Sequence, residues 1–262
     1  MDKASWGGVV LGLFGIIGGL LLEGGSISQI VQPTAAMIVF GGTVGAVLLQ
    51  FPLPVVISAA ARLVQVFFQP DINPRGRVQE LVEYAKRARR EGIVSLDAEL
   101  ELIHDSFLQK PLMLAVDGTE PQELRKLMEL DHDNQAEYEE KIPQVFESAG
   151  GFSPTIGIIG AVLGLIQVMQ HLDKIDEVGK GIAVAFVATI YGVGAANLFL
   201  LPVAGKLRIR IREEQALREM TLEGVVSILE GMNPRMLETK LLGYLAEDKP
   251  QPSPKAEAEL AK

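Results

Sequence analysis

The stretch that decides the fold is a pair of apolar segments in the second half of the chain. The first, Pro154–Leu172, reads PTIGIIGAVLGLIQVMQHL, and the second, Gly181–Pro202, reads GIAVAFVATIYGVGAANLFLLP; neither contains Lys, Arg, Asp or Glu. Each has about the twenty residues that a helix needs to cross roughly 30 Å of hydrocarbon. Pro154 and Pro202 lie near the same side of the membrane, and Thr189 lies inside the second segment. This pairing favours a moving or ion-conducting part over a simple anchor.

Two further apolar segments lie near the N-terminus, at Trp6–Leu22 and Pro33–Phe51, and the second continues weakly towards Ala61. The chain is 48% apolar with a mean hydropathy of +0.26, yet 22% of its residues are charged. Nearly all of that charge lies outside the four segments. The sequence therefore predicts an all-α, polytopic membrane protein with four transmembrane helices and a cytoplasmic helical region.

The distribution of Lys and Arg predicts the orientation. Of 24 basic residues, 11 lie between Arg62 and Lys141 and ten lie from Lys206 onward, whereas none lies between Glu23 and Gln32. Basic segments stay preferentially on the cytoplasmic side of a membrane. Both termini and the long 62–150 segment of this multi-pass protein are therefore expected in the cytoplasm.

These assignments divide the chain into five parts. They are two transmembrane helices over 1–61, a cytoplasmic helical region over 62–150, two transmembrane helices over 151–203, cytoplasmic C-terminal helices over 204–246, and a disordered tail over 247–262.

Caps and breaks divide the polar parts into shorter helices. The predicted helices run from Asn73-Pro74 to Gly92, from Ser95 as N-cap through Leu108, from Thr119 onward, and from Arg235 to Ala246. Gly150-Gly151 predicts a break before the third span. The helices of the 62–150 segment are too few for a large core of their own, so they are expected to pack on one another and on neighbouring subunits.

Small residues give the first and third spans a face for close helix approach. They are Gly8, Gly12, Gly15 and Gly19 in the first span, and Gly157, Gly160, Ala161 and Gly164 in the third. Thr189 has two interpretations, a structural hydroxyl bonded to its own helix or a channel-lining group. Pro154 and Pro202 are either helix boundaries or hinges that transmit a change in the channel to the cytoplasmic helices.

The spans contain no carboxylate, although intramembrane carboxylates are the usual mark of an ion path. A proton channel built from this chain would therefore need a carboxylate from a partner. The net charge of −9 argues against nucleic acid, and the absence of cysteine removes thiolate chemistry and cysteine metal sites. The dispersed histidines lack metal-ligand spacing, and no catalytic set or phosphate loop supports an enzyme or a cofactor.

In its order of motifs the sequence resembles the MotA/PomA family of flagellar motor stator subunits, within the MotA/TolQ/ExbB superfamily, over about residues 1–246. The motifs are Leu22-Glu-Gly-Gly, Ala88-Arg-Arg-Glu-Gly-Ile-Val-Ser-Leu-Asp97, Leu114-Ala-Val-Asp-Gly118, Pro154-Thr-Ile-Gly-Ile-Ile-Gly-Ala-Val-Leu-Gly164, Ala188-Thr-Ile-Tyr-Gly192, Leu201-Pro202 and Glu230-Gly-Met-Asn-Pro-Arg235.

The resemblance implies a cyclic pentamer around two copies of a MotB-like, single-span partner that supplies the channel aspartate. Ion flow would rotate the pentamer, whose cytoplasmic face pushes on the rotor protein FliG. Arg89, with Arg90 beside it, matches the rotor-facing arginine of the family, and Asp97 takes the place of its acidic companion, which is often Glu. Pro154 and Pro202 match the two prolines of the family, and Thr189 matches its channel-lining threonine.

The resemblance also bears on the ion. Sodium-driven relatives carry threonine where this chain has Ala161 and Ala188. Because two oxygen ligands for a cation are missing, we expect the ion that drives this protein to be the proton and not sodium.

The nearest alternative is an ExbB/TolQ-like proton-driven subunit that energises outer-membrane processes. Such relatives typically have three spans and no counterpart of the Arg89–Asp97 stretch. A solute transporter would need a polar midplane pocket, which these spans can hardly form. A passive scaffold would leave the Pro154, Thr189 and Pro202 arrangement without use.

Overall fold

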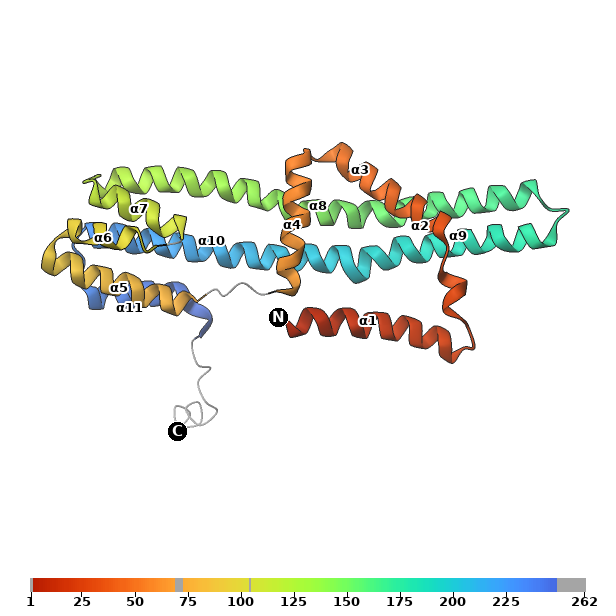
Figure 1. Cartoon of the computed structure of the whole chain (residues 1–262), viewed down its shortest axis with the longest axis horizontal. Coiled ribbons are helices and arrows are strands. Elements are labelled where there is room, and N and C mark those ends of the chain that lie inside the picture. Colours follow the sequence, from red (N-terminus) through yellow and green to blue (C-terminus); the bar gives the residue numbers. More distant parts are fainter. Residues whose placement is uncertain (1, 69–72, 104, 249–262) are drawn as a thin grey trace, which may run out of the picture. The chain divides into compact units, whose positions relative to one another are not determined.

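The computed structural model describes residues 2–68, 73–103 and 105–248, and every regular element in these ranges is helical (Figure 1). Four helical stretches are long and apolar enough to cross a membrane. The predicted all-α fold with four spans is confirmed. The predicted tail over 247–262 lies almost entirely outside the described residues.

The chain forms two compact units, the first from residues 1–70 and 137–211 and the second from 71–136 and 212–262. The 50-residue helix α8 (Pro121–Gln170) and the helix α10 (Leu201–Leu229) each contribute one part to each unit.

The first unit holds the apolar spans. Its remaining elements are α1 (Lys3–Leu22), η1 (Ile27–Ile30), α2 (Pro33–Ala36), the π-helical η2 (Met37–Gly41), α3 (Gly42–Gln50), α4 (Leu53–Phe67), α9 (Ile175–Ala195) and the π-helical η4 (Ala196–Leu200).

The second span ends before Ala61 because of a proline. Pro52 forces the preceding residue, Phe51, into an extended conformation with φ −116° and ψ 144°, so α3 stops at Gln50. A separate helix, α4, then begins at Leu53 and packs Val55, Ala59 and Val66 into a buried cluster with α8 and α10.

The predicted break at Gly150-Gly151 is wrong, because α8 runs through both glycines. A glycine inside a helix costs only about 1 kcal/mol relative to alanine, which tertiary packing can offset. A Cβ at Gly150 would lie 2.7 Å from Leu201 Cδ2. Gly150 therefore allows close approach of the neighbouring helix and does not end its own.

The second unit contains α5 (Pro74–Glu91), η3 (Ile93–Leu96), α6 (Asp97–Leu100), α7 (Ser106–Val116), α11 (Pro234–Leu242) and η5 (Gly243–Asp248), besides its parts of α8 and α10. The first predicted helix is confirmed, since the Asn73 side chain caps α5 and Gly92 ends it with φ +83°.

The predicted helix from Ser95 to Leu108 is wrong. The Ser95 hydroxyl donates to the Gly92 carbonyl at 2.7 Å and caps no helix. The chain turns after Leu100, and Asp105 caps the separate helix α7 by accepting from Phe107 N at 2.9 Å. The last predicted helix is also shorter than expected, because α11 stops at Leu242 before Gly243.

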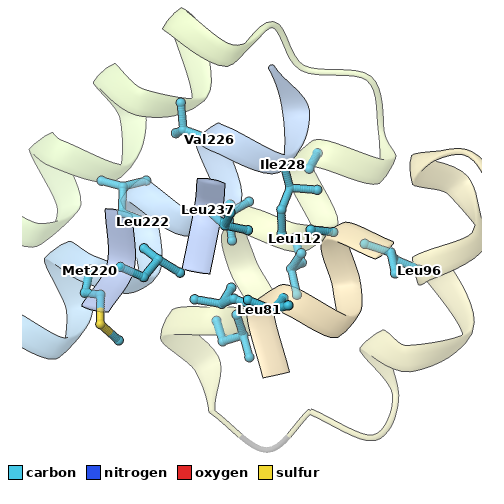
Figure 2. Packing of buried hydrophobic residues seen from close by; sticks show 14 of the residues in the cluster. Leu81, Leu96, Leu112, Met220, Leu222, Val226, Ile228 and Leu237 are labelled. Atoms are coloured by element: carbon cyan, nitrogen blue, oxygen red, sulfur yellow. The ribbon is translucent and has the colours of Figure 1, made fainter. Parts of the chain in front are cut away.

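The second unit has a substantial core of its own, contrary to expectation. Leu81, Leu96, Leu112 and Leu237 are fully buried in it (Figure 2). Met220, Leu222, Val226 and Ile228 from α10 join the same cluster. The hydrophobic core of the helices in the 62–150 segment is thus completed by residues of α10 and α11, which follow this segment by more than sixty residues.

Candidate functional site

The helices α8 and α9 cross so closely in the first unit that their backbones touch. A Cβ at Gly157 would lie 2.9 Å from the Ala188 carbonyl oxygen, and one at Gly164 would lie 2.7 Å from the Gly181 carbonyl oxygen. At these distances, a side chain larger than hydrogen would fit only if the backbone of the facing helix moved. The small-residue face predicted for the third span is therefore used here, as a backbone-to-backbone contact along the hairpin of α8 and α9.

The small residues of the first span are used differently. A Cβ at Gly8, Gly15 or Gly19 would meet nothing within 4 Å, and only Gly12 approaches a neighbour, Leu198 Cδ2 at 3.4 Å. Within the described part of the chain, the predicted close packing along this face of α1 is absent.

Pro154 and Thr189 lie at the same crossing. A Cβ at Gly192 would lie 3.2 Å from Pro154 Cα, and one at Gly157 would lie 3.5 Å from Thr189 Cα. Both residues are half-buried. The Thr189 hydroxyl donates to the Ala185 carbonyl at 3.2 Å, which is the bond to its own helix that the structural interpretation expects. The oxygen keeps acceptor capacity beyond that bond.

Pro202 lies farther along the same end of the hairpin, one residue after Leu201, which packs on Gly150. Neither proline is a helix boundary, because α8 continues on both sides of Pro154, and helix also continues on both sides of Pro202. The boundary interpretation is wrong for both prolines. The π-helical turn η4 ends at Leu200, two residues before Pro202, and π turns inside α-helices occur frequently at functional sites.

The two alanines compared with sodium-driven relatives have different environments. Ala161 is half-buried, whereas Ala188 is fully buried and its Cβ would lie 2.8 Å from a Cβ placed on Gly160. Extra side-chain atoms at 188 would press against α8.

The rotor-facing candidates lie together in sequence at the end of α5 and the start of α6. Arg89, Arg90 and Asp97 are exposed. The neighbouring charges are engaged with one another, since Arg87 pairs with Glu99 and, at 3.5 Å, with Glu91. The pair from Arg87 to Glu99 joins α5 to α6, and the three candidates remain on the surface.

One cluster that the sequence did not indicate fixes the start of α1. The carboxylate of Asp2 accepts from Ala4 N and Ser5 N, at 3.0 and 3.1 Å, and pairs with Lys206 and Arg210 of α10. The hydrogen bond from Lys206, followed by that from the Ser5 backbone, lowers the pKa of Asp2 to about 2. Asp2 is therefore a charged N-cap that joins α1 to α10.

A second unpredicted cluster ties three helices of the second unit together. Glu223 of α10 pairs with Arg125 of α8 at 2.8 Å and with Lys240 of α11. Lys240 also donates to Ser227 at 3.1 Å. Only an i+3 or i+4 spacing would have revealed such pairs from sequence, and these partners are distant in the chain.

The four apolar helical stretches and the all-helical fold define a multi-pass, all-helical membrane protein. The model of the MotA/TolQ/ExbB proton channel family matches residues 99–220, and that of the motility protein A N-terminal region matches residues 6–92.

Individual relatives agree with the family models. Motility protein A of Bacillus subtilis (strain 168) is 37% identical, with 94% of this chain and 91% of the relative covered. Chemotaxis protein PomA of Vibrio alginolyticus is 32% identical, with 95% and 97% covered.

Solved structures are similar over the same extent. The structure of C. jejuni MotAB has a TM-score of 0.89 at 30% identity, covering 95% of this chain and 98% of that one. The flagellar MotAB stator complex from Bacillus subtilis has a TM-score of 0.84 at 36% identity, with the same coverage. The chain belongs to the motility protein A family, the stator subunits of the flagellar motor. This is a family of channel and force-generating subunits and not of enzymes.

Proposed function

We propose that this stator subunit conducts protons and converts the proton-motive force into torque together with a MotB-like, single-span partner. The observation that carries the proposal is a contrast within the spans. Thr189 lies against Gly157 and Pro154 lies against Gly192 at a tight crossing, whereas Pro154–Leu172 and Gly181–Pro202 contain no carboxylate. A proton path without its own carboxylate needs one from a second chain. The relatives of known structure are MotAB complexes, which supports this partner.

The rest of the assembly follows from the same proposal. Five copies surround two partner chains in the inner membrane, with lipid around them. Both termini, residues 62–150 and residues 204–246 lie in the cytoplasm, as the basic cluster Lys206–Arg212 favours. Pro154 and Pro202 act as hinges beside Thr189 and Ala161, which line the ion path.

In the cytoplasm, Arg89, Arg90 and Asp97 act on charged residues of the rotor protein FliG. Their exposure, and the engagement of Arg87 with Glu99, support this role. The identity of the ion rests on alanine at 161, where an oxygen ligand for sodium is missing.

The proposal is tested by deleting the gene in its host and examining both filaments and rotation. Cells with complete filaments that do not rotate, rescued by the intact gene, are the expected result. Other stator genes are removed in the same strain and swimming is also scored in viscous medium, since a second stator set would mask the defect. Full rotation in that strain, with loss of an outer-membrane uptake process, would instead identify an ExbB/TolQ-like role.

A further inference from the structure

The outward face of α9 and η4 is apolar except at one end. Its exposed side chains are Ile182, Phe186, Ile190, Val193 and Asn197. Thr189 lies half-buried at the edge of this face. An amide exposed to hydrocarbon costs several kcal/mol when it is not hydrogen-bonded. The end of the face that carries Asn197 is therefore suited to water or protein and not to lipid chains.

The helix holds the Asn197 amide in a fixed position. Asn197 is the second residue of the π turn η4, and its Nδ2 donates to the Val193 carbonyl at 2.9 Å. A similar bond occurs in the second span, where Thr43, two residues after the end of the π turn η2, donates to the Val39 carbonyl at 2.6 Å. Thr43 is buried, however, whereas Asn197 is exposed and keeps its Oδ1 as an acceptor.

A second polar side chain lies at the same end of the hairpin. Thr155, directly after Pro154, is exposed, and its hydroxyl donates to the Phe152 carbonyl at 2.8 Å. Two contacts show the position of Asn197 along the length of the hairpin. Pro154 of α8 lies next to Gly192, and Gly150 of α8 lies next to Leu201. Asn197 lies between these two contacts, on the side away from the short turn that joins α8 to α9.

We propose that Asn197, with Thr155 on the neighbouring span, forms the cytoplasmic exit of the ion path. The amide Oδ1 and the threonine oxygen accept hydrogen bonds from the waters that carry the proton beyond Thr189. The proton passes from water to water, and neither side chain gains or loses one. This inference rests on the proposed proton-conducting function, and it adds Asn197 on the cytoplasmic side of the crossing and Thr155 at the crossing itself, next to Pro154.

Substitutions at Asn197 in cells that retain the native partner test the proposal. Asn197→Leu keeps the size and removes the acceptor; we expect motor speed at low load, where ion transit limits rotation, to fall about fivefold, equivalent to about 1 kcal/mol in the barrier. Asn197→Gln keeps the amide and is expected to retain most of the speed. Ile190→Leu, on the same face, is the control expected to match the wild type.

Asn197→Asp separates an exit role from a structural one. A carboxylate in a water-filled exit titrates, so lowering the cytoplasmic pH with a permeant weak acid should change the speed of this variant more than that of the wild type. Membrane levels of every variant are measured by immunoblot.

Wild-type speed in Asn197→Leu and an unchanged pH profile in Asn197→Asp would overturn the assignment. If Asn197→Leu is lost from the membrane, the pH profile of Asn197→Asp decides alone. The outcomes separate the two proposals. If the wild-type chain restores rotation to the deletion strain, the stator function is supported whatever the Asn197 variants do. If the wild-type chain does not restore rotation, the proposed function itself is contradicted.

Discussion

Individual glycines at the crossing of α8 and α9 are positions where one methyl group has a large effect. A Cβ on Gly164 would lie 2.7 Å from the Gly181 carbonyl oxygen and 2.9 Å from Ala185 N, so backbone would have to move. We expect Gly164→Ala to lower the free energy of unfolding by about 1–3 kcal/mol through overpacking. The midpoint of thermal unfolding of the purified chain in detergent measures this. Gly18→Ala, where nothing lies within 4 Å, is the matched control. Equal midpoints for the two variants would contradict the close crossing.

Thr189 offers a second test at the same scale. Thr189→Val preserves shape and removes the hydroxyl, so proton transit should slow and motor speed at low load, where ion transit limits rotation, should fall. Thr43→Val makes the same chemical change at a buried hydroxyl of the second span and should affect stability without slowing transit. Unchanged speed in Thr189→Val would mean that the hydroxyl has no role in proton transit and only bonds the Ala185 carbonyl.

At the scale of elements, the attachment of α1 depends on its first turn. The Asp2 cluster with Lys206 and Arg210 holds one end, and Gly12 against Leu198 marks the middle. Because the chain has no cysteine, Gly12→Cys with Leu198→Cys introduces the only thiols. We expect a short bifunctional thiol reagent to link them efficiently, and Asp2→Asn to reduce the yield severalfold.

The pKa of Asp2 gives this attachment a defined pH dependence. Its value in the folded chain is about 2, below the ordinary 3.8, so the carboxylate stabilises the fold at every pH above the ordinary value. That stabilisation is lost only as the pH falls through about 2. Because thiol reagents react with the thiolate, the cross-linking yield at each pH is normalised to the labelling of the Gly12→Cys single variant, and the normalised yield should be constant across the neutral range. A decline near neutral pH would show that Asp2 is not the group that holds α1.

The helices of the second unit depend in the same way on Glu223. Its side chain is 12% exposed and joins α10 to α8 and α11. Glu223→Gln leaves Arg125 and Lys240 without their shared carboxylate, which should cost about 1–3 kcal/mol. Thermal unfolding measures this loss, with the exposed Glu238→Gln as control. A loss no larger than that of the control would remove Glu223 from the interactions that hold these helices together.

For the whole molecule, torque should depend on the exposed charges of α5 and α6. We expect Arg89→Glu or Asp97→Lys to reduce torque while membrane levels stay normal, because neither residue takes part in a described ion pair. Torque on tethered cells and immunoblots of membranes measure the two effects. Lys126→Glu, an exposed reversal on α8, is the control. Normal swimming by both reversed variants would remove these residues from the rotor interface.

Hydropathy predicts the membrane spans of such a molecule, because the free energy of transferring a segment from water to the membrane depends on the composition of that segment. It could not predict that α8 continues through Gly150, since that depends on Leu201 from another helix. The placement of Pro154 and Thr189, thirty-five residues apart in sequence, at one crossing depends equally on how the two helices pack. The Asp2 and Glu223 clusters were missed for the same reason, because their partners are distant in the chain.

The crossing of α8 and α9 also limits how the family can vary in length. Side chains at an ordinary helix interface can change rotamer to accept a small shift, but backbone atoms in contact cannot. Inserting one residue within 157–164 would rotate Gly157 away from Ala188 and turn larger neighbours into the contact. Inserting one in the turn between Gln170 and Ile175 would leave every glycine opposite its present neighbour. Natural insertions and deletions should therefore collect in that turn and be absent from the two spans beside it.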